Sequence, residues 1–552
     1  MKIIRFAFAN SKGLVTLSIL AGVVTGLSST AVIALINKAL TSPPPSRNDL
    51  LALYIILCVL MPLARTAAAF LLIRLSQRVT YDLRMQLSSR ILAAPLRHLE
   101  EVGAHRLLAA LTDDVLVISN AVVNIPVLCI DLTILVGCLA YLAYLSLPVF
   151  FIILGFIVAG VLSYMLPVAK ANQRLREARD LQNDLFKQFG ALTGGVKELK
   201  LHQQRADSFL NGVLSSLTDA VRRQTASGMT IYAVASSWGQ VLLFVFVGLL
   251  LFGLGDRLGA SAEVLTGCAL ISLYTMSSLE VVVNVLPLLG RAGIAIEYIE
   301  KLGISLASNT TEQLRPARVP PNPGWRRLDL EQVTYRYRPE EDGQAFTVGP
   351  INMTLTPGEI VFVTGGNGSG KTTCAKLLTG LYTPEGGEIR LDGQPINDEN
   401  RAAYRQNFST VFFDFYLFDT LLGLEDANAD GRVSLYLDRL QLSHKVGVRD
   451  GRLTTTELSQ GQRKRLALLT AYLENRPIYV FDEWAADQDP HFKEVFYHQL
   501  LPELKHNGKT VVVISHDDRY FSCADRVIKL DSGQVDAGSS ANGARRRAHE
   551  LR

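Results

Sequence analysis

The sequence predicts two different halves: an all-α membrane domain of six helices with long cytoplasmic helical extensions, followed by a soluble α/β domain. Only 19% of the 552 residues are charged and the mean hydropathy is +0.22, whereas soluble proteins carry about 25% charged residues. All the long uncharged runs lie before about residue 290. This composition excludes a wholly soluble or disordered protein. The net charge of +4 gives little support for a nucleic-acid partner, and we expect none.

The first half contains apolar runs that are long enough to cross about 30 Å of hydrocarbon as helices. The run from 115 to 169 carries one charge, Asp131, and the turn-forming sequence Leu-Ser-Leu-Pro at 145–148 divides it into two spans. The first apolar run is too long for a signal peptide and lacks an Ala-x-Ala site. We expect a transmembrane domain at 1–304, with helices at about 14–37, 50–74, 116–144, 148–169, 229–254 and 264–289.

The basic residues predict how these spans are oriented. The segments 74–114 and 170–223 hold six and ten Lys or Arg, whereas the loops on the other side hold three in all. Because basic loops stay in the cytoplasm, both termini and both long segments are expected there, in a multi-pass protein of the inner (cytoplasmic) membrane. Apolar residues at helical spacing in both segments predict that they continue the spans as helices.

The second half is expected to be one soluble domain between two irregular segments. A Pro-, Asn- and Thr-containing linker is predicted at 305–325, the soluble domain at 326–536 and a flexible tail at 537–552. The six cysteines form no CxxC pair, which favours buried thiols in a reducing compartment over a disulfide framework or a zinc site.

The most specific motif follows an apolar strand at 359–364 and precedes a helix. Its glycines let successive backbone N–H groups surround phosphates, while the helix offers its positive N-terminus. Lys371 can reach the β and γ phosphates and Thr372 can bind Mg²⁺, which predicts an ATP site with Mg²⁺ as cofactor. A turn that only connected a strand to a helix would not need Lys followed by Thr. The predicted phosphate-binding residues are Gly365, Asn367, Gly368, Ser369, Gly370, Lys371, Thr372 and Thr373.

A second apolar strand, at 478–481, ends in two carboxylates. This pattern is typical of a buried parallel strand that delivers side chains at its carboxyl edge. Asp482 would hold the metal, directly or through water, and Glu483 would act as general base on the attacking water. A strand ending in Asp-Glu is common, so this interpretation depends on the phosphate loop upstream.

Two further motifs complete a recognisable order. Leu-Ser-Gln-Gly-Gln at 458–462 precedes a basic amphipathic helix, and His516 follows an apolar strand at 510–515. Phosphate loop, LSxGQ, Asp-Glu strand and histidine in this order resemble the ATP-binding domain of ABC transporters. With six spans upstream, nearly the whole chain resembles an ABC exporter half-transporter. The runs DEWAADQDPH at 482–491 and SHDDRYF at 515–521 resemble the subgroup that exports cyclic peptides, microcins and siderophore precursors such as that of pyoverdine.

The resemblance implies a homodimer that holds two ATP molecules between its soluble domains, with both sites active. Ser459, Gly461 and Gln462 would contact the γ-phosphate of the ATP held by the other protomer. His516 would sense the γ-phosphate. Two further residues match family positions: Asp489, the aspartate of the loop that crosses the dimer, and Tyr337, the aromatic residue that stacks on adenine. An ordinary strand tyrosine is an equally good interpretation of Tyr337.

This sequence departs from the family pattern at two places. Phe413 and Asp414 stand where the family has the glutamine that meets the membrane domain, so a glutamine role in sensing Mg²⁺ is in doubt, and Asp414 is a candidate substitute. Gln460 replaces a glycine of the signature, and we expect its side chain to face solvent or the partner.

Three ionisable residues interrupt the apolar spans: Arg65, Asp131 and Glu280. An ionisable group in the membrane is costly unless it faces a cavity or a partner. They are candidate substrate contacts in a polar cavity, and the alternatives are a structural ion pair or a charge that reaches the interface from a span end.

These observations predict an ATP hydrolase coupled to export of a peptide-derived secondary metabolite, which would be a cyclic peptide, a lipopeptide or a siderophore precursor. The alternatives are an ABC lipid flippase, a multidrug exporter, or a membrane-anchored regulatory ATPase that moves no cargo. Retention of Glu483, Gln462 and His516 favours a transporter over a regulator.

Overall fold

The computed structural model describes residues 2–41, 47–249, 252–253, 262–301, 322, 324–337, 346–424 and 431–536. The chain divides into two compact units, one of residues 1–94 and 98–313 and one of residues 95–97 and 314–552. Most of the linker expected at 305–325 and all of the tail expected at 537–552 lie outside the described residues.

Every secondary-structure element in the described part of the first unit is a helix. Short π-helical turns at Ala110–Asp114 and Ser208–Leu214 continue the long helices. The helices of residues 2–301 are α1 Lys2–Thr41, α2 Arg47–Ala93, α3 Leu96–Val102, α4 Ala104–Ala109, α5 Val115–Leu145, α6 Leu147–Gly194, α7 Val196–Leu201, α8 Gln203–Asp207, α9 Ser215–Leu249 and α10 Ala262–Lys301.

Five stretches of this unit are long and apolar enough to cross a membrane. The span expected at 148–169 lies inside α6, whose described apolar stretch, Leu147–Gly160, is shorter than these five. The end of the span expected at 229–254 lies partly outside the described residues. The long helices α2, α6 and α9 continue well beyond the apolar segments, through sequences rich in Lys and Arg.

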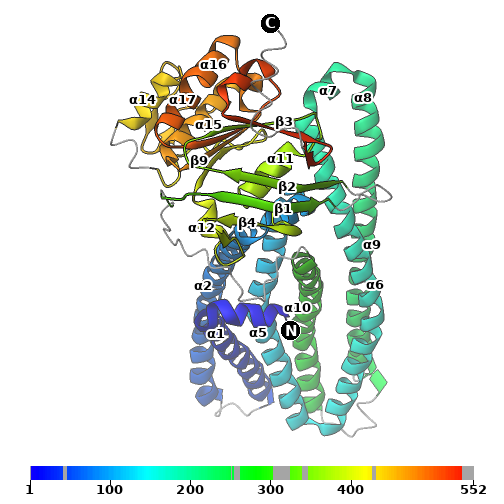
Figure 1. Cartoon of the computed structure of the whole chain (residues 1–552). Helices are drawn as coiled ribbons and strands as arrows, with labels where there is room; N and C mark the ends of the chain where they lie inside the picture. The colour runs from blue at the N-terminus through cyan, green and yellow to red at the C-terminus, as the bar shows by residue number, and fades with distance from the viewer. Residues whose placement is uncertain are drawn as a thin grey trace. The chain divides into compact units, whose positions relative to one another are not determined.

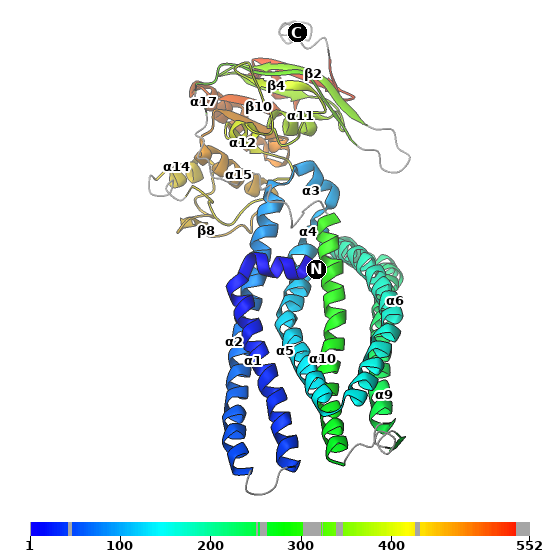
Figure 2. The ribbon, with the colours of Figure 1, turned by 90° about the horizontal axis from the view of Figure 1, so that it is seen from below.

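The long helices pack in two groups, seen in Figures 1 and 2. α1, α2, α5 and α10 lie against one another, and α6 runs along α9. The buried ion pair between Arg179 of α6 and Asp114 connects α6 to the π-helical turn before α5, with 2.6 Å between Nη2 and Oδ2. Because two charges are buried only when they satisfy each other, this pair fixes how α6 lies against that turn.

The second unit is built around a six-stranded sheet in the order β12-β11-β3-β10-β9-β6, in which only β12 is antiparallel. Side chains of β3 alternate between two cores. Ile360 and Phe362 face the core that contains α14–α17, and Val361 and Val363 face the core that contains α11 and β1. A strand that is buried on both faces needs this continuous apolar sequence.

A four-stranded antiparallel sheet, in the order β2-β1-β4-β5, covers the α11 side of the unit (Figure 1). The strands are β1 Leu328–Arg336, β2 Thr347–Leu355, β3 Ile360–Thr364, β4 Gly386–Leu391, β5 Gln394–Pro395, β6 Phe408–Val411, β7 Val448–Arg449, β8 Arg452–Leu453, β9 Ile478–Asp482, β10 Thr510–Ile514, β11 Arg526–Asp531 and β12 Gln534–Val535. The helices are α11 Lys371–Leu378, α12 Arg401–Arg405, α14 Arg432–Arg439, α15 Gln460–Glu474, α16 Pro490–Val495 and α17 Leu501–His506.

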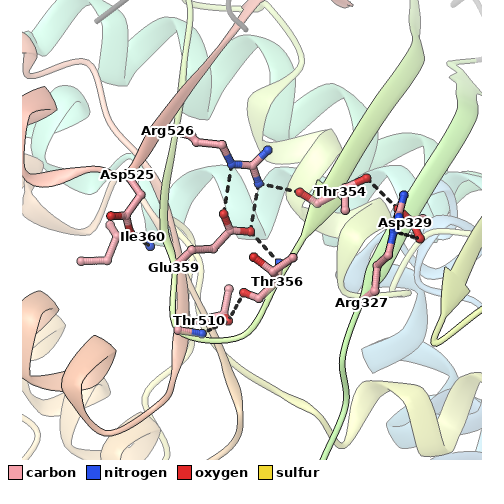
Figure 3. Close-up of polar contacts among 10 residues, drawn as sticks. Arg327, Asp329, Thr354, Thr356, Glu359, Ile360, Thr510, Asp525 and Arg526 are labelled. Carbon is pink, nitrogen blue, oxygen red and sulfur yellow. Dashed lines mark hydrogen bonds and ion pairs between the residues drawn. The ribbon is translucent and has the colours of Figure 1, made fainter. Parts of the chain in front are cut away.

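A polar network at the turn between β2 and β3 holds the two sheets together (Figure 3). Arg526 of β11 binds both carboxylate oxygens of Glu359, at 3.0 and 2.9 Å, and donates to the Thr354 carbonyl of β2 at 2.5 Å. The Thr356 backbone N–H donates to Glu359, and the Thr510 hydroxyl of β10 donates to the Thr356 carbonyl. The strand that leads into the phosphate loop is thereby fixed at its start.

Replacing Glu359 with Gln should lower the free energy of unfolding of this unit by about 1–3 kcal/mol, because Arg526 loses a bidentate carboxylate. The measurement is the midpoint of the unfolding transition of this unit. That transition is identified by its shift to a higher midpoint when ATP is added. Glu388→Gln is the control, because its ion pair with Arg390 is exposed and should contribute less than about 0.5 kcal/mol. Equal shifts in the two variants would contradict the prediction.

Candidate functional site

The predicted catalytic groups meet because they follow neighbouring parallel strands. β10 lies between β3 and β9 and pairs with both in parallel. The phosphate loop follows β3, Glu483 follows β9, and His516 lies two residues beyond β10. Since the carboxyl ends of parallel strands meet at one edge of a sheet, residues from three distant stretches of sequence come together there.

The phosphate loop, residues 365–370, connects β3 to α11 with a backbone that requires glycine. Gly365, Gly368 and Gly370 all have positive φ, at 151°, 76° and 93°. A Cβ on Gly365 would lie 2.2 Å from the Leu530 carbonyl oxygen, so the space excludes any side chain as well. The loop places the N-terminus of α11 at its centre, which is the arrangement that binds phosphate.

Lys371, the first residue of α11, folds its ammonium back over this loop. Its Nζ donates to the carbonyl oxygens of Gly365 and Gly366, at 3.1 and 3.0 Å, and lies 3.9 Å from Glu483 Oε1. Burial lowers the pKa of Lys371, and the nearby carboxylates of Glu483 and Asp482 oppose that shift. The ammonium therefore sits in the cradle where phosphate oxygens can replace the two carbonyls.

Asp482 and Thr372 form the part of the site that is suited to a metal. The Thr372 hydroxyl donates to Asp482 Oδ2 at 2.9 Å. Asp482 is fully buried, and its Oδ1 finds no hydrogen-bond partner among the described residues. Burial raises the pKa of Asp482, and the Thr372 hydrogen bond opposes this. A buried carboxylate oxygen without a partner, beside a hydroxyl, is a suitable ligand pair for Mg²⁺, which binds few protein groups and keeps phosphate and water ligands.

Glu483 lies one residue further on, at the mouth of the site. Its Oε1 is 2.9 Å from Nε2 of His516. Its backbone has a φ of 48°, in the left-handed region, which a residue other than glycine adopts at a cost of about 1–3 kcal/mol. The side chain is 28% exposed, so water reaches the carboxylate. This geometry is compatible with the role predicted for Glu483, which is to accept a proton from water at the edge of a phosphate site.

The signature residues lie at the start of α15. Ser459 caps the helix: its hydroxyl accepts from the Gln462 backbone N–H, and the Gln462 side chain accepts from the Ser459 N–H, at 3.4 and 3.3 Å. Gln460 is exposed. The contacts described for Ser459 stay within its own helix, which leaves the helix N-terminus open to an anion from outside the chain.

Asp489 caps another helix, α16, where it accepts from the Phe492 backbone N–H at 2.9 Å and pairs with Arg465 of α15. Its neighbour Gln488 donates to the Gly461 carbonyl at 3.0 Å. A Cβ on Gly461 would lie 2.7 Å from the Asp487 carbonyl oxygen. Glycine is therefore required here because the loop after Glu483 passes directly against the signature helix.

Tyr337 directly follows β1 and lies against α11, the helix that the phosphate loop leads into. Its hydroxyl lies 2.8 Å from the hydroxyl of Thr373 in α11, and its ring is part of an aromatic group with Tyr335 and Phe346. The residue is 36% exposed. The adenine role of Tyr337 stays a prediction, and so does its alternative, an ordinary strand tyrosine.

Phe413 and Asp414, which replace the family glutamine, also lie near Asp482, one of the two predicted metal ligands. The Phe413 backbone N–H lowers the pKa of Asp482, and the negative charge of Asp414 raises it. Asp414 is exposed. The segment thus contributes a carboxylate close to Asp482, although it contributes no amide side chain.

The first unit holds a separate cavity of about 500 Å³ between α6, α9 and α10. Apolar side chains line nearly all of it, among them Phe156, Leu242 and Val283. At one end the Tyr232 hydroxyl donates to the Asn172 amide oxygen at 2.8 Å. An amphiphile with one polar group fits such a lining better than a strongly charged molecule does.

The three predicted membrane charges lie elsewhere, and none of them lines this cavity. Asp131 is half-buried on α5 and hydrogen-bonds Ser278 of α10. It also interacts electrostatically with the positive charge of Arg65. Arg65 on α2 and Glu280 on α10 are exposed in the single chain. Arg65 therefore lies near enough to Asp131 to act on its charge, and the substrate role of the three residues stays a prediction.

Two residues at the nucleotide site escaped the sequence prediction: Lys464 and Asp487. Lys464 is buried to 1% exposure, and its Nζ lies 2.7 Å from Asp487 Oδ2. The sequence places Lys464 in a basic run of an amphipathic helix, which is typical of a solvent-exposed face. Nothing in the sequence of this run marks Lys464 as the buried residue.

Comparison with known proteins gives consistent matches. Residues 348–486 match the family model described as ABC transporter. The ATP-binding protein SyrD of Pseudomonas syringae pv. syringae is 35% identical over 541 residues, which cover 97% of this chain and 95% of that protein. The ATP-dependent lipid A-core flippase of Ralstonia nicotianae is 26% identical over 88% of this chain and 84% of its own length.

A solved structure is also similar over nearly the whole chain. The structure of a bacterial Atm1-family ABC exporter with ATP bound superposes with a TM-score of 0.76 at 16% identity, covering 97% of this chain and 95% of that one. At this identity the match shows the fold, whereas the match to SyrD extends through both units.

Proposed function

The chain belongs to the ABC transporter family, and we propose that it exports a peptide-derived amphiphile across the cytoplasmic membrane. The predicted fold class is confirmed: a helical membrane unit is joined to an ABC ATP-binding domain in an exporter fold. The protein is a multi-pass membrane protein that binds and hydrolyses ATP to drive export. The cargo, the homodimer, the inner-membrane location and the roles of single residues are parts of the proposal.

In the proposed mechanism two chains bind two ATP molecules between their ATP-binding domains. Lys371 and the backbone of residues 365–370 hold the phosphates of one chain's ATP, while Ser459 and Gly461 of the second chain approach the γ-phosphate. Glu483 accepts a proton from the attacking water as the water oxygen bonds to phosphorus and ADP leaves. The 2.9 Å contact with His516 orients the Glu483 carboxylate.

Mg²⁺ is the cofactor that this arrangement fits, with Thr372 and Asp482 as its protein ligands. When bound, it would neutralise charge on the β and γ phosphates. The buried Asp482 Oδ1, which has no hydrogen-bond partner among the described residues, supports this assignment. Asp414 adds a second negative charge nearby.

The observation that carries the cargo class is the motif run 482–491, which resembles that of peptide-metabolite exporters, in a chain that matches SyrD over 97% of its length. The cavity adds that the cargo has a large apolar part. Its apolar lining would take an acyl chain or apolar side chains, and the Tyr232–Asn172 pair would hydrogen-bond a polar group at one end. A lipopeptide meets both requirements.

Lipid flipping is the second candidate, because two relatives with 26% and 27% identity are named as lipid A-core flippases and an apolar cavity accepts acyl chains from either source. The two candidates differ in the polar part of the cargo. A lipopeptide exporter should distinguish a cyclic peptide headgroup from a phosphorylated sugar headgroup that carries similar acyl chains.

The experiment uses the full chain in proteoliposomes and measures ATP hydrolysis relative to its own basal rate. We expect an acylated cyclic peptide to stimulate hydrolysis, and neither its deacylated form nor a lipid A-core lipid to do so. Leu242→Trp, which fills the cavity, should reduce the stimulation by about fivefold or more, since a tightly packed ligand site tolerates little added volume. Val245→Trp is the matched control, because Val245 lies on α9 outside the cavity and is 54% exposed.

Stimulation by the lipid A-core lipid alone would favour the flippase. Equal loss in Leu242→Trp and Val245→Trp would remove the cavity from the proposal.

A further inference from the structure

Lys464 is a buried lysine beside the proposed catalytic base. It lies on α15, five residues after Ser459, and is 1% exposed. Its ammonium contacts the Asp487 carboxylate at 2.7 Å, the Glu483 carbonyl oxygen at 3.0 Å and the ring of Phe413, whose centroid is 4.9 Å away. A buried ammonium is stable only with such partners, so this position is built for a lysine.

Lys464 and the segment that carries Glu483 are joined twice. The Lys464 ammonium donates to the Glu483 carbonyl, and the Lys464 carbonyl accepts from the Trp484 indole N–H at 2.8 Å. Trp484 is itself fully buried, with its ring stacked on Phe496. Lys464 of the signature helix therefore hydrogen-bonds both the backbone of Glu483 and the side chain of Trp484.

These hydrogen bonds hold the backbone of Glu483 in a conformation that is unfavourable without them. Glu483 has φ 48° and ψ 33°, a left-handed conformation that persists only where its surroundings enforce it. Three described hydrogen bonds hold its peptide groups. The Glu483 N–H donates to the Ile514 carbonyl at 3.1 Å, and the Glu483 carbonyl accepts from the Ala486 N–H at 3.3 Å and from Lys464 at 3.0 Å. The bond from Lys464 is the only one of the three that a side-chain substitution removes.

We propose that Lys464 is a positioning residue for ATP hydrolysis, which holds Glu483 in the left-handed conformation that aims its carboxylate at the attacking water. Asp487 and the Phe413 ring hold the ammonium in place. Phe413 occupies the position of the family glutamine, so this chain uses that position to support the base through Lys464. The inference rests on the proposed role of Glu483 as base.

The test is Lys464→Met in the full chain, reconstituted as the dimer, with kcat and KM for ATP measured separately. Methionine keeps the apolar stem and removes the donor. We expect kcat to fall about 10- to 100-fold, since a small displacement of a catalytic group has an effect of this size, while KM stays within about twofold because the phosphate loop is unchanged. The control is Lys505→Met, which removes the surface ion pair with Asp525 and should leave kcat unchanged.

A merely structural role would lower Tm and active-site concentration without changing kcat per folded site, and that result would overturn the proposal. Asp487→Asn covers the case in which Lys464→Met does not fold, because Asn keeps an acceptor for the ammonium. It should lower kcat about two- to fivefold at constant KM. A change in KM at constant kcat would contradict the role in positioning.

A double-mutant cycle separates this proposal from the role of the base itself. In a Glu483→Gln background, measured by single-turnover hydrolysis, Lys464→Met should cause no further loss greater than about twofold, because residues that act as one unit are not additive. A full additional loss would show that Lys464 acts elsewhere. If Glu483→Gln alone retained activity, the proposed base would be wrong, whatever Lys464→Met did.

Discussion

Glu483→Gln should reduce steady-state ATP hydrolysis by about a hundredfold or more, the usual contribution of a positioned general base, while the protein still binds ATP. The amide keeps the size of the side chain and its contact with His516, and it cannot take a proton from water. Thr372, Asp482 and Lys371 are unchanged, so phosphate and metal binding survive. The ATP-bound dimer should therefore accumulate with trapped nucleotide.

The measurements are the hydrolysis rate and the amount of nucleotide that stays bound after rapid gel filtration. Glu503→Gln is the matched control, because Glu503 forms an exposed ion pair with Arg439 and should leave both quantities unchanged. Near-normal turnover in Glu483→Gln would remove the residue from the mechanism. A loss of nucleotide binding instead would place Glu483 among the binding groups.

The parts of this site that could be predicted from the sequence are those whose functional residues are neighbours in the chain. The phosphate loop needs three residues with positive φ and a following Lys-Thr pair, and these are adjacent in the chain. The convergence of Glu483 and His516 was also predictable, because apolar strands that end in polar residues align their carboxyl ends in a parallel sheet. The two residues are 2.9 Å apart because they follow the neighbouring strands β9 and β10. The order of the motifs in the family implies this order of strands.

Contacts set by packing between helices and loops were not predictable in this way. Lys464 and Glu483 are 19 residues apart, and nothing in the basic run around Lys464 distinguishes the buried cation from its less buried neighbours Arg463 and Arg465. Burial of Lys464 depends on the Phe413 ring and the Asp487 carboxylate, which arrive from two other segments. The same holds in the membrane unit, where Asp131 hydrogen-bonds Ser278 of a helix far along the chain.

Mixed dimers should recover hydrolysis that neither of two mutants has alone. Ser459→Arg places a long cation at the open N-terminus of α15, where a phosphate would bind, and Lys371→Ala removes the ammonium from the phosphate loop. If ATP lies between two chains, each mutant homodimer has two defective sites. A dimer of one Ser459→Arg chain and one Lys371→Ala chain has one site in which both the loop and the signature are intact, because a two-fold symmetric dimer contributes each motif to both sites.

The structure gives a physical reason to expect this division between chains. The described contacts of Ser459 are with Gln462 of its own helix, and the end of that helix, with its partial positive charge, is free to bind an anion. Lys371, by contrast, is held over the phosphate loop of its own chain by the carbonyls of Gly365 and Gly366. Within one chain, Ser459 and Lys371, the two groups proposed to bind the γ-phosphate, therefore make no described contact with each other.

Mixed dimers can be isolated with two different affinity tags, and their hydrolysis compared with each mutant homodimer. With one intact site, a mixed dimer should reach no more than about half of the wild-type rate. A dimer that carries Ser459→Arg on one chain and Lys505→Met on the other tests whether the tags or the reconstitution limit the rate, because Lys505 lies in a surface ion pair away from both motifs. Full activity of the Ser459→Arg homodimer would show that each chain completes its own site, and the sandwiched arrangement would then be wrong.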